Sequence, residues 1–560
     1  MMQMLTPETL TSAKPAHAIA HIETVQTVGF ISKKDQFTLK NNNNASQISD
    51  FEKDIFFAPT QSYKANQAKI KYVLTSNHLF EYKNNVAKEI IYTNENVTSN
   101  IGSKVWLGIQ NVQHSLQGTH FFFKAPNTDP HNSIYSFLSK TLWYSRNDQP
   151  ISYMLGYQQE DAWQKDLPVD EILHMQKTAN KSYDTSINGF YRQQFITLED
   201  RESRLDYDDR RIPNVLQDFY PSDLTDPIIN EKLVWIEIRF PEYLSVDRLE
   251  TLNYYTNCIP IANKQLYDRV FELNDFINII PLQTEDTFFD IESISDSDGK
   301  MVNIRDLQEE NNDTSALLRY GGIARFDERD ANATIKNLIQ LLRDESTAFD
   351  TLGRNFVSNE IKSLQQILNK LEQRMLQNTQ TRESIPHLVV SLPEKDKETG
   401  RSSLFVEYWA TQGKSANGLN PNVNLIPYKT SGINHFESYL VTTTVGGRDN
   451  LSVPDKINAY KYALLSHDRI VSEEDIQQFC KLQLANALHE VNISKGMMID
   501  HDPSRGYTKT IDISIFIKKL AYIAMKEKDE LDFWQSFLLK EIKKRSQSLI
   551  PYRIFLKEMV

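Results

Sequence analysis

Apolar and polar residues follow a short-period pattern in the first 135 residues of the chain. Ala68 to Leu74 alternates with a period of two, while Val105 to Ile109 and Thr119 to Lys124 are short apolar runs separated by the residues Ser-Leu-Gln-Gly. Alternation, and short aromatic or β-branched runs bounded by turn residues, are typical of strands. We therefore predict a β-rich N-terminal part in which the two apolar runs pair with each other.

Strand patterns return in the middle of the chain, at Leu233 to Phe240, Ile277 to Leu282 and Phe288 to Ile294. The turn-forming residues Asp296 to Lys300 follow the last of these. Residues 330–345 and 359–377 then change to i, i+3, i+4 spacing of Ile and Leu, which predicts two helices that each pack through one face.

The C-terminal part mixes both patterns. Leu388 to Leu392 and Leu404 to Ala410 are apolar runs joined by a charged turn, which predicts a hairpin. Thr510 to Ile515 alternates and predicts a strand. Leu531 to Lys544 predicts a helix.

The segment from Val445 to Cys480 is the most informative. It begins with Gly446 and Gly447, which predict a close approach of a strand and a helix. An amphipathic helix ending near Leu465 follows, and Ser472 with Asp475 predicts the capping box of a second helix.

Between residues 136 and 230 the chain is polar and rich in aspartate, yet it contains aromatic residues such as Trp143, Trp163 and Tyr220. Disordered segments are poor in aromatics, so we predict an ordered insertion or satellite domain here. Because single cores stop growing at roughly 250–300 residues, 560 residues predict several domains. We predict an α+β, multidomain protein with a β-rich N-terminal domain (1–135), the insertion (136–230), a β-rich middle domain (231–320), a helical segment (321–380) and an α+β C-terminal domain (381–560).

Charge and composition exclude several classes of function. The 62 basic and 74 acidic residues give a net charge of −12, which argues against a nucleic-acid binder. No phosphate-binding glycine motif is present, and two cysteines are too few for a zinc cage or a disulfide framework. The N-terminus lacks the pattern of a cleaved signal and no run is long enough for a membrane span, so we expect a soluble, cytoplasmic protein.

Three groups of residues carry candidate chemistry. Ser466-His-Asp-Arg has the residue types of a catalytic triad, but triad members normally come from separate elements. His489-Glu lacks a second histidine four residues later and is interpreted as helix surface. The aspartates from Asp286 to Asp298 lack the ligand spacing of a calcium loop and are interpreted as turn residues. We predict no catalytic, cofactor or metal site, so the protein is not expected to be an enzyme.

Several segments resemble a known family in the expected order. Residues 5–8, 14–21 and 51–60 are similar to N-terminal segments of the TssF subunit family of the type VI secretion baseplate. Asn257 to Asn263 and Phe289 to Ile294 resemble its middle strands, although Ile259 replaces a threonine and Ala262-Asn-Lys stands where Asn-Leu-Phe is expected. The helical leader common in that family is expected to be missing or shortened. The two helices around Ser472 resemble the C-terminal unit of J-type wedge proteins of contractile tails.

This resemblance, closest to divergent systems of Bacteroidetes-like bacteria, implies a structural wedge subunit in a cytoplasmic baseplate near the inner membrane, which helps to trigger sheath contraction. It implies two copies of this subunit per wedge and a TssG-like subunit. A TssE-like sheath initiator, a TssK-like linker and the spike hub would be the other partners, with no nucleic acid and no membrane insertion.

The alternatives are a wedge protein of an extracellular contractile particle or phage-like tail, a hydrolase with a carboxylate and histidine site, and a β-rich extracellular binding module. The candidate subunit-interface residues are Asp468, Arg469, Glu474, Lys543, Lys544 and Arg545. The last three belong to a C-terminal cluster of six basic and two acidic residues on an acidic chain.

Overall fold

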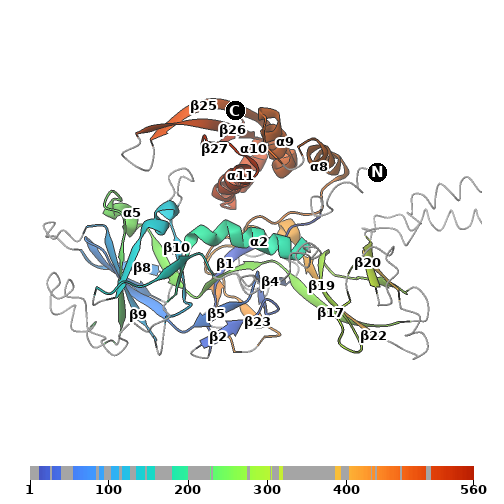
Figure 1. Cartoon of the computed structure of the whole chain (residues 1–560), viewed down its shortest axis with the longest axis horizontal. Helices are drawn as coiled ribbons and strands as arrows, with labels where there is room; N and C mark the ends of the chain where they lie inside the picture. Colours follow the sequence, from blue (N-terminus) through green and yellow to red (C-terminus); the bar gives the residue numbers. More distant parts are fainter. Residues whose placement is uncertain are drawn as a thin grey trace, which may run out of the picture. The chain divides into compact units, whose positions relative to one another are not determined.

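The structure is a computed structural model of the chain (Figure 1). It describes residues 12–25, 28–39, 54–83, 87–93, 102–112, 116–126, 134–145, 148–157, 179–199, 228, 231, 233–273, 278–302, 304, 315–319, 385–391, 403–430, 432–434, 438–466, 469–499 and 506–559. None of the helices in this part of the chain is both long and apolar enough to cross a membrane.

The chain forms two compact units, one from residues 1–266 with 411–560 and the other from residues 267–410. Both contain several sheets, and the first also contains helices, so the α+β, multidomain prediction is confirmed. The first unit combines segments that the sequence analysis assigns to different domains. Phe57, Ile187, Ile261 and Leu440 share one core although they come from four predicted domains. The five domains as independently folding parts stay a prediction.

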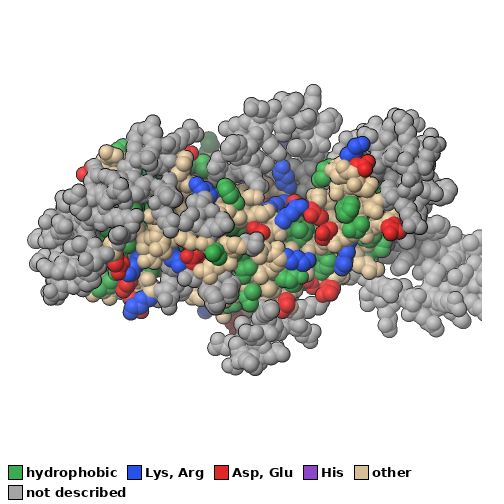
Figure 2. All heavy atoms as spheres, turned by 90° about the horizontal axis from the view of Figure 1, so that it is seen from below, with side chains coloured by type: hydrophobic (Ala, Val, Ile, Leu, Met, Phe, Trp, Pro, Cys, Tyr) green, Lys and Arg blue, Asp and Glu red, His purple; other side chains and the backbone are tan. Residues whose placement is uncertain are grey.

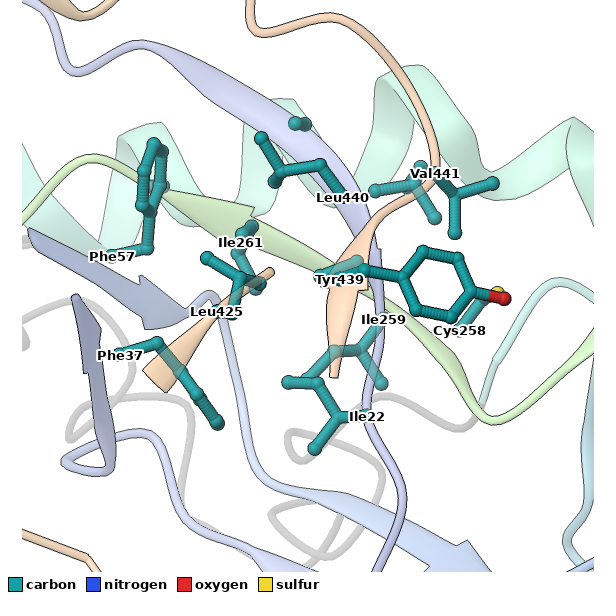
Figure 3. Packing of buried hydrophobic residues seen from close by; sticks show 14 of the residues in the cluster. Ile22, Phe37, Phe57, Cys258, Ile259, Ile261, Leu425, Tyr439, Leu440 and Val441 are labelled. Atoms are coloured by element: carbon teal, nitrogen blue, oxygen red, sulfur yellow. The ribbon is translucent and has the colours of Figure 1, made fainter. Parts of the chain in front are cut away.

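Strands of the first sheet of the larger unit contribute many residues of this core (Figure 3). Its strand order is β23 (Ile426–Tyr428), β3 (Gln36–Leu39), β4 (Ile55–Pro59), β16 (Cys258–Ala262), β1 (His17–His21) and β24 (Tyr439–Leu440). β1 and β16 are antiparallel, with His17 opposite Ala262 and His21 opposite Cys258. All five residues of each strand are buried, as expected for strands covered on both faces.

Two further sheets enclose a second core. One has the order β12 (Tyr153–Leu155), β13 (Phe195–Leu198), β10 (His120–Lys124) and β15 (Asn253–Thr256). The other has the order β11 (Leu142–Ser145), β14 (Val234–Arg239), β9 (Lys104–Gln110), β6 (Lys69–Leu74), β7 (His78–Lys83) and β8 (Ala87–Thr93). Phe121 and Phe123 of one sheet and Leu107 and Ile236 of the other belong to the same cluster.

The predicted strands at residues 68–74, 105–109, 119–124 and 233–240 are confirmed, but the predicted pairing of β9 with β10 is wrong. β9 pairs with β14 and β6, and β10 pairs with β13 and β15. Both strands are apolar, but they belong to different sheets, and their side chains meet across the core. Each strand therefore pairs with strands that are distant from it in the sequence.

Short elements complete this part of the unit: the two-stranded sheet of β2 (Val28–Ile31) and β5 (Tyr63–Asn66), the helices α2 (Ala179–Tyr191) and α5 (Val246–Glu250), and the 3-10 turns η4 (Ile134–Lys140), η6 (Arg192–Gln194) and η8 (Gly413–Ala416). α2 packs on the first core through Ile187 and Tyr191. It lies in the segment predicted as an insertion and is part of the main core.

The smaller unit contains two three-stranded sheets around a core of its own. Their orders are β17 (Gln265–Glu272), β22 (Ser403–Thr411), β19 (Thr287–Asp296), and β18 (Asn278–Pro281), β21 (His387–Ser391), β20 (Ser315–Arg319). The strands expected near residues 277–282, 288–294, 388–392 and 404–410 are present. The predicted hairpin of the last two is wrong, because β21 lies between β18 and β20 while β22 lies between β17 and β19. The two predicted helices at 330–345 and 359–377 lie outside the described residues.

The C-terminal lobe, residues 451–559, has a separate core within the larger unit. Its elements are α8 (Val453–Ser466), α9 (Glu473–Leu484), the 3-10 turn η9 (Ala485–Ala487), β25 (Leu488–Ile499), β26 (Tyr507–Ile517), α10 (Lys519–Glu527), α11 (Leu531–Arg545) and β27 (Tyr552–Glu558). β25 and β26 are antiparallel and β27 is parallel to β26. The two helices around Ser472, the strand near 510 and the helix from Leu531 are confirmed. Ser472 and Asp475 form the predicted capping box.

Candidate functional site

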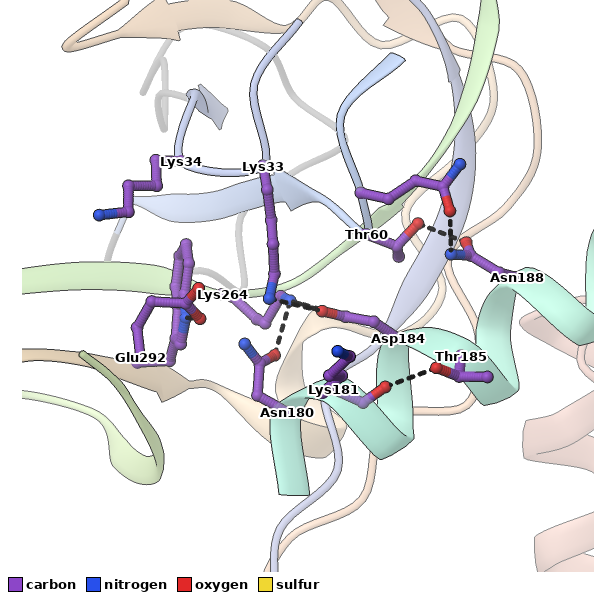
Figure 4. Close-up of polar contacts among 12 residues, drawn as sticks. Lys33, Lys34, Thr60, Asn180, Lys181, Asp184, Thr185, Asn188, Lys264 and Glu292 are labelled. Carbon is purple, nitrogen blue, oxygen red and sulfur yellow. Dashed lines mark hydrogen bonds and ion pairs between the residues drawn. The ribbon is translucent and has the colours of Figure 1, made fainter. Parts of the chain in front are cut away.

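A buried polar stripe runs along α2. Asn180, Asp184 and Asn188 are spaced four residues apart, so they lie on one face of the helix, and all three are buried (Figure 4). Their side chains point toward the elements on which α2 packs rather than toward solvent. Because a buried polar group without a partner costs free energy, the stripe requires matching groups on those elements.

Lys264 supplies the match for the first two residues. Its side chain is fully buried, and its Nζ lies 2.7 and 3.0 Å from the two carboxylate oxygens of Asp184 and 2.8 Å from Asn180 Oδ1 (Figure 4). Lys33 Nζ lies 3.6 Å from the same carboxylate. The buried ammonium is therefore paired and hydrogen-bonded, as a buried charge must be.

Asn188 forms the other end of the stripe. Its Oδ1 accepts hydrogen bonds from the hydroxyls of Thr60 and Tyr63, and its amide donates to Gln61 Oε1 at 3.1 Å. The stripe fixes the position of α2 along and around its axis, because a rotation or a shift by one residue would separate all of these pairs.

The C-terminal end of α2 contacts the C-terminal lobe. Lys540 of α11 donates to the carbonyl oxygens of Gly189 and Phe190. Free carbonyls at a helix C-terminus carry partial negative charge, so a lysine there is stabilising. Burial lowers the pKa of Lys540 to about 8.

His17 of β1 lies in the same contact. Its ring is 5.3 Å from that of Phe533 on α11, and its Nδ1 is hydrogen-bonded to the Tyr191 hydroxyl at 2.9 Å. Burial lowers the pKa of His17 to about 3, so the ring is neutral at pH 7. We call Lys540, Phe533, His17 and the end of α2 the α2–α11 junction.

The predicted role of the glycine pair is confirmed at this junction. Gly446 has a φ of +81°, and a Cβ there would lie 2.6 Å from His17 Nε2 and 3.1 Å from Phe533 Cζ. At Gly447 a Cβ would lie 2.3 Å from the Gly413 carbonyl oxygen. Strand β1 and helix α11 approach here so closely that no side chain fits.

The candidate interface residues all belong to the C-terminal lobe, but the structure gives them different surroundings. Arg469 and Glu474 are exposed near the start of α9, and Lys543 and Lys544 are exposed on α11. Asp468 lies outside the described residues. The predicted interface stays a prediction.

Arg545 makes contacts inside the lobe. Its guanidinium forms an ion pair with Glu541 and lies 5.1 Å from the centre of the Phe479 ring. Its carbonyl accepts a hydrogen bond from the Ile470 amide at 3.1 Å, next to a parallel bridge between Ile470 and Ser546. These bonds join the connection before α9 to the end of α11.

The other candidate groups have local explanations. The Ser466 hydroxyl donates to the Tyr462 carbonyl at 2.9 Å, and His467 lies outside the described residues. His489 is exposed on strand β25, so its assignment to a helix is wrong; the helix ends at Leu484 and a 3-10 turn leads into the strand. Asp296 Oδ1 accepts from the amides of Asp298 and Lys300, which confirms the turn. In the described part of the chain, no three His, Cys, Asp or Glu side chains are placed to hold a metal ion.

Both cysteines are buried and belong to hydrophobic clusters, Cys258 to that of the first sheet and Cys480 to that of the C-terminal lobe. Burial raises the pKa of the Cys480 thiol to about 12 and that of Cys258 well above its usual value. Neither thiol is therefore ionised near neutral pH.

The C-terminal lobe exposes much apolar surface. Leu549, Val471, Leu520 and Tyr507 are 100%, 89%, 85% and 77% exposed, and only Phe30 reaches a similar value elsewhere among the described residues.

On the face drawn in Figure 2, acidic and basic side chains are interspersed rather than gathered by sign.

The contact of Lys264 with its partners on α2 was not predicted from the sequence. The four-residue spacing of Asn180, Asp184 and Asn188 is visible in the sequence, and it would have indicated a helix with a polar stripe. Nothing local indicates that this stripe is buried, because its partner Lys264 lies 80 residues away from Asp184.

No protein-family model matches this chain, and no curated protein matches it. Among solved structures, the chain is similar to a cryo-electron microscopy structure of the type VI secretion system TssK-TssF-TssG baseplate subcomplex. The TM-score is 0.38 and the identity 9%, and the match covers 99% of this chain and 90% of that chain. A likeness at this level carries no argument about function.

Proposed function

We propose that this protein is a structural subunit whose function is assembly, specifically a wedge component of a type VI secretion baseplate. In this role two copies would join a TssG-like subunit around the spike hub, next to TssE-like and TssK-like proteins, and help to trigger sheath contraction. The resemblance of its N-terminal, middle and C-terminal segments to baseplate proteins supports the choice of machine.

One structural observation carries the proposal of an assembly function. The C-terminal lobe has a complete core of its own, yet it leaves large apolar side chains such as Leu549, Val471 and Leu520 exposed. Contiguous exposed apolar side chains are typical of protein–protein interaction sites, and in this lobe the exposed Ile499 and Tyr507 lie opposite each other on β25 and β26. The buried charges of Lys264 and Asp184 are paired with each other and support the fold.

Native mass spectrometry on the chain co-expressed with a TssG-like protein from the same gene cluster tests this proposal. We expect a stable complex with two copies of this chain and one TssG-like subunit. If the chain stays monomeric when it is co-expressed with the TssG-like protein, the proposal is contradicted. A complex of another composition would support assembly but reject the wedge stoichiometry.

A further inference from the structure

The hairpin of β25 and β26 has two different faces. Side chains alternate along a strand, and the register of the pair is regular from Glu490 to Ile499. Odd-numbered residues of both strands therefore share one face. Near the lobe core this face is buried: Val491, Ile513 and Ile515 pack with residues of α9 and α11.

The same face continues past the helices without cover. Beyond Ile493 and Ile511, which are half-buried, the next apolar residues of this face are Met497, Ile499 and Tyr507. They are 66%, 68% and 77% exposed, and Ile499 lies directly opposite Tyr507. Figure 1 shows the hairpin of β25 and β26 extending away from α9 and α11. Apolar side chains on the face that packs on the core thus become accessible at the outer half of the hairpin.

Two lysines lie within this face, between its apolar side chains: Lys495 between Ile493 and Met497 on β25, and Lys509 between Ile511 and Tyr507 on β26. Lys509 lies opposite Met497, Lys495 lies opposite Ile511, and both lysines are exposed. We call Lys495, Met497, Ile499, Tyr507 and Lys509 the distal ribbon face. It carries two positive charges and no acidic residue, on a chain whose net charge is −12.

We propose that the distal ribbon face binds an amphipathic helix of a partner protein, with acidic residues flanking its apolar side. The inner half of this hairpin face is already covered by helices, so a further helix would continue the same layer. Lys495 and Lys509 on the same face select acidic residues by charge complementarity. The inference deepens the proposed assembly function by naming the chemistry of one partner.

Fluorescence anisotropy with the full chain and labelled model helices tests this inference. The probe is a peptide of roughly 18 residues, long enough to form a helix, with Leu at i, i+3, i+4 and i+7 and Glu on both flanks. A matched peptide has Lys in place of each Glu. We expect the Glu peptide to bind about tenfold more tightly at low salt, and the preference to shrink as salt screens the charges.

Variants identify the face. Met497→Ser should weaken binding of the Glu peptide, whereas Met498→Ser, on the opposite face of the same strand, should leave it unchanged. The double variant Lys495→Glu/Lys509→Glu should reverse the preference toward the Lys peptide. Lys557→Glu on β27, which removes an exposed lysine from the opposite face of the sheet, is the charge control and should retain the original preference.

The inference would be overturned by no binding of the Glu peptide, by equal binding of both peptides, or by equal effects of the Met497 and Met498 variants. Self-association of the chain that disappears in Ile499→Ser would also overturn it, because a second copy would then be the occupant. If wedge assembly with a TssG-like protein still occurs in any of these cases, only the ribbon assignment fails and the proposed function stands.

Discussion

At the scale of single residues, the buried pair of Lys264 and Asp184 determines how α2 is held. Asp184→Ala should destabilise the protein by about 3–5 kcal/mol, because it leaves a fully buried ammonium without its carboxylate. The free energy of unfolding from urea denaturation measures this. Thr185→Ala, an exposed neighbour on the same helix, is the control and should change stability little.

His17 should make stability depend on pH. Its folded-state pKa of about 3 lies below the unfolded value near 6.5, so below pH 6.5 the unfolded chain binds a proton that the folded chain does not. Stability is therefore complete above pH 6.5 and falls as the pH decreases toward 3. At pH 5 the loss from this one group is about 2 kcal/mol. His17→Asn should flatten the pH profile of unfolding, and the exposed His489→Asn should not.

Arg469 tests the predicted interface. It is exposed immediately before α9, so Arg469→Glu should leave circular dichroism and thermal unfolding unchanged. We expect co-purification of partner subunits to decrease by about tenfold, since a reversed charge at an interface opposes association. Normal recovery of the partners would exclude Arg469 from the interface. Lys461→Glu, an exposed change on α8, is a matched control.

At the scale of elements, the capping box fixes where α9 begins. The Ser472 hydroxyl accepts from the Asp475 amide, and the Asp475 carboxylate accepts from the Ser472 amide at 2.8 Å. These bonds lower the pKa of Asp475. Ser472→Ala should cost about 1 kcal/mol of stability, and Ser472→Asp, which also caps, should cost much less. Thermal unfolding of the two variants compares them directly; equal losses would mean that the cap has no role.

The α2–α11 junction shows how elements far apart in the chain depend on one another. Lys540 on α11 binds the last carbonyls of α2, and the aromatic rings of Phe533 and Phe190 lie 5.4 Å apart beside it. Glycine at position 446 is required because His17 and Phe533 occupy the space of a side chain. One small contact thus joins a strand, two helices and a turn.

At the scale of the whole molecule, residues 267–410 form a unit inserted into the other. The two ends of the insertion are held together within the larger unit, because Asn263 Oδ1 accepts from the Thr411 hydroxyl at 3.1 Å and the Gln412 amide at 2.9 Å. Replacing residues 267–410 with a short Gly-Ser linker should therefore leave the larger unit folded. A cooperative thermal transition and a monomeric elution volume are expected. Loss of cooperative unfolding would show that the larger unit needs the insertion.

Local patterns predicted many elements but few of their partners. The alternation at 68–74 and the box at Ser472 are decided within a few residues, and both are present. The pairing of β9 with β10 and of β21 with β22 was predicted from proximity in sequence, and both pairings are wrong. A strand with both faces buried carries no local signal for its neighbour, so distance along the chain is a poor guide to sheet order.

The sequence by itself determined the turn at Asp296 to Lys300, the start of α9 at its capping box and the strand character of segments such as 68–74. Only the tertiary structure decided that α2 belongs to the main core and that Lys264 is buried against Asp184. The same holds for the outer half of the β25–β26 face, which is left uncovered. The physical reason is the sequence distance over which each feature is decided. Turns, caps and periodicity depend on neighbouring residues, whereas burial depends on which distant part of the chain packs against a residue.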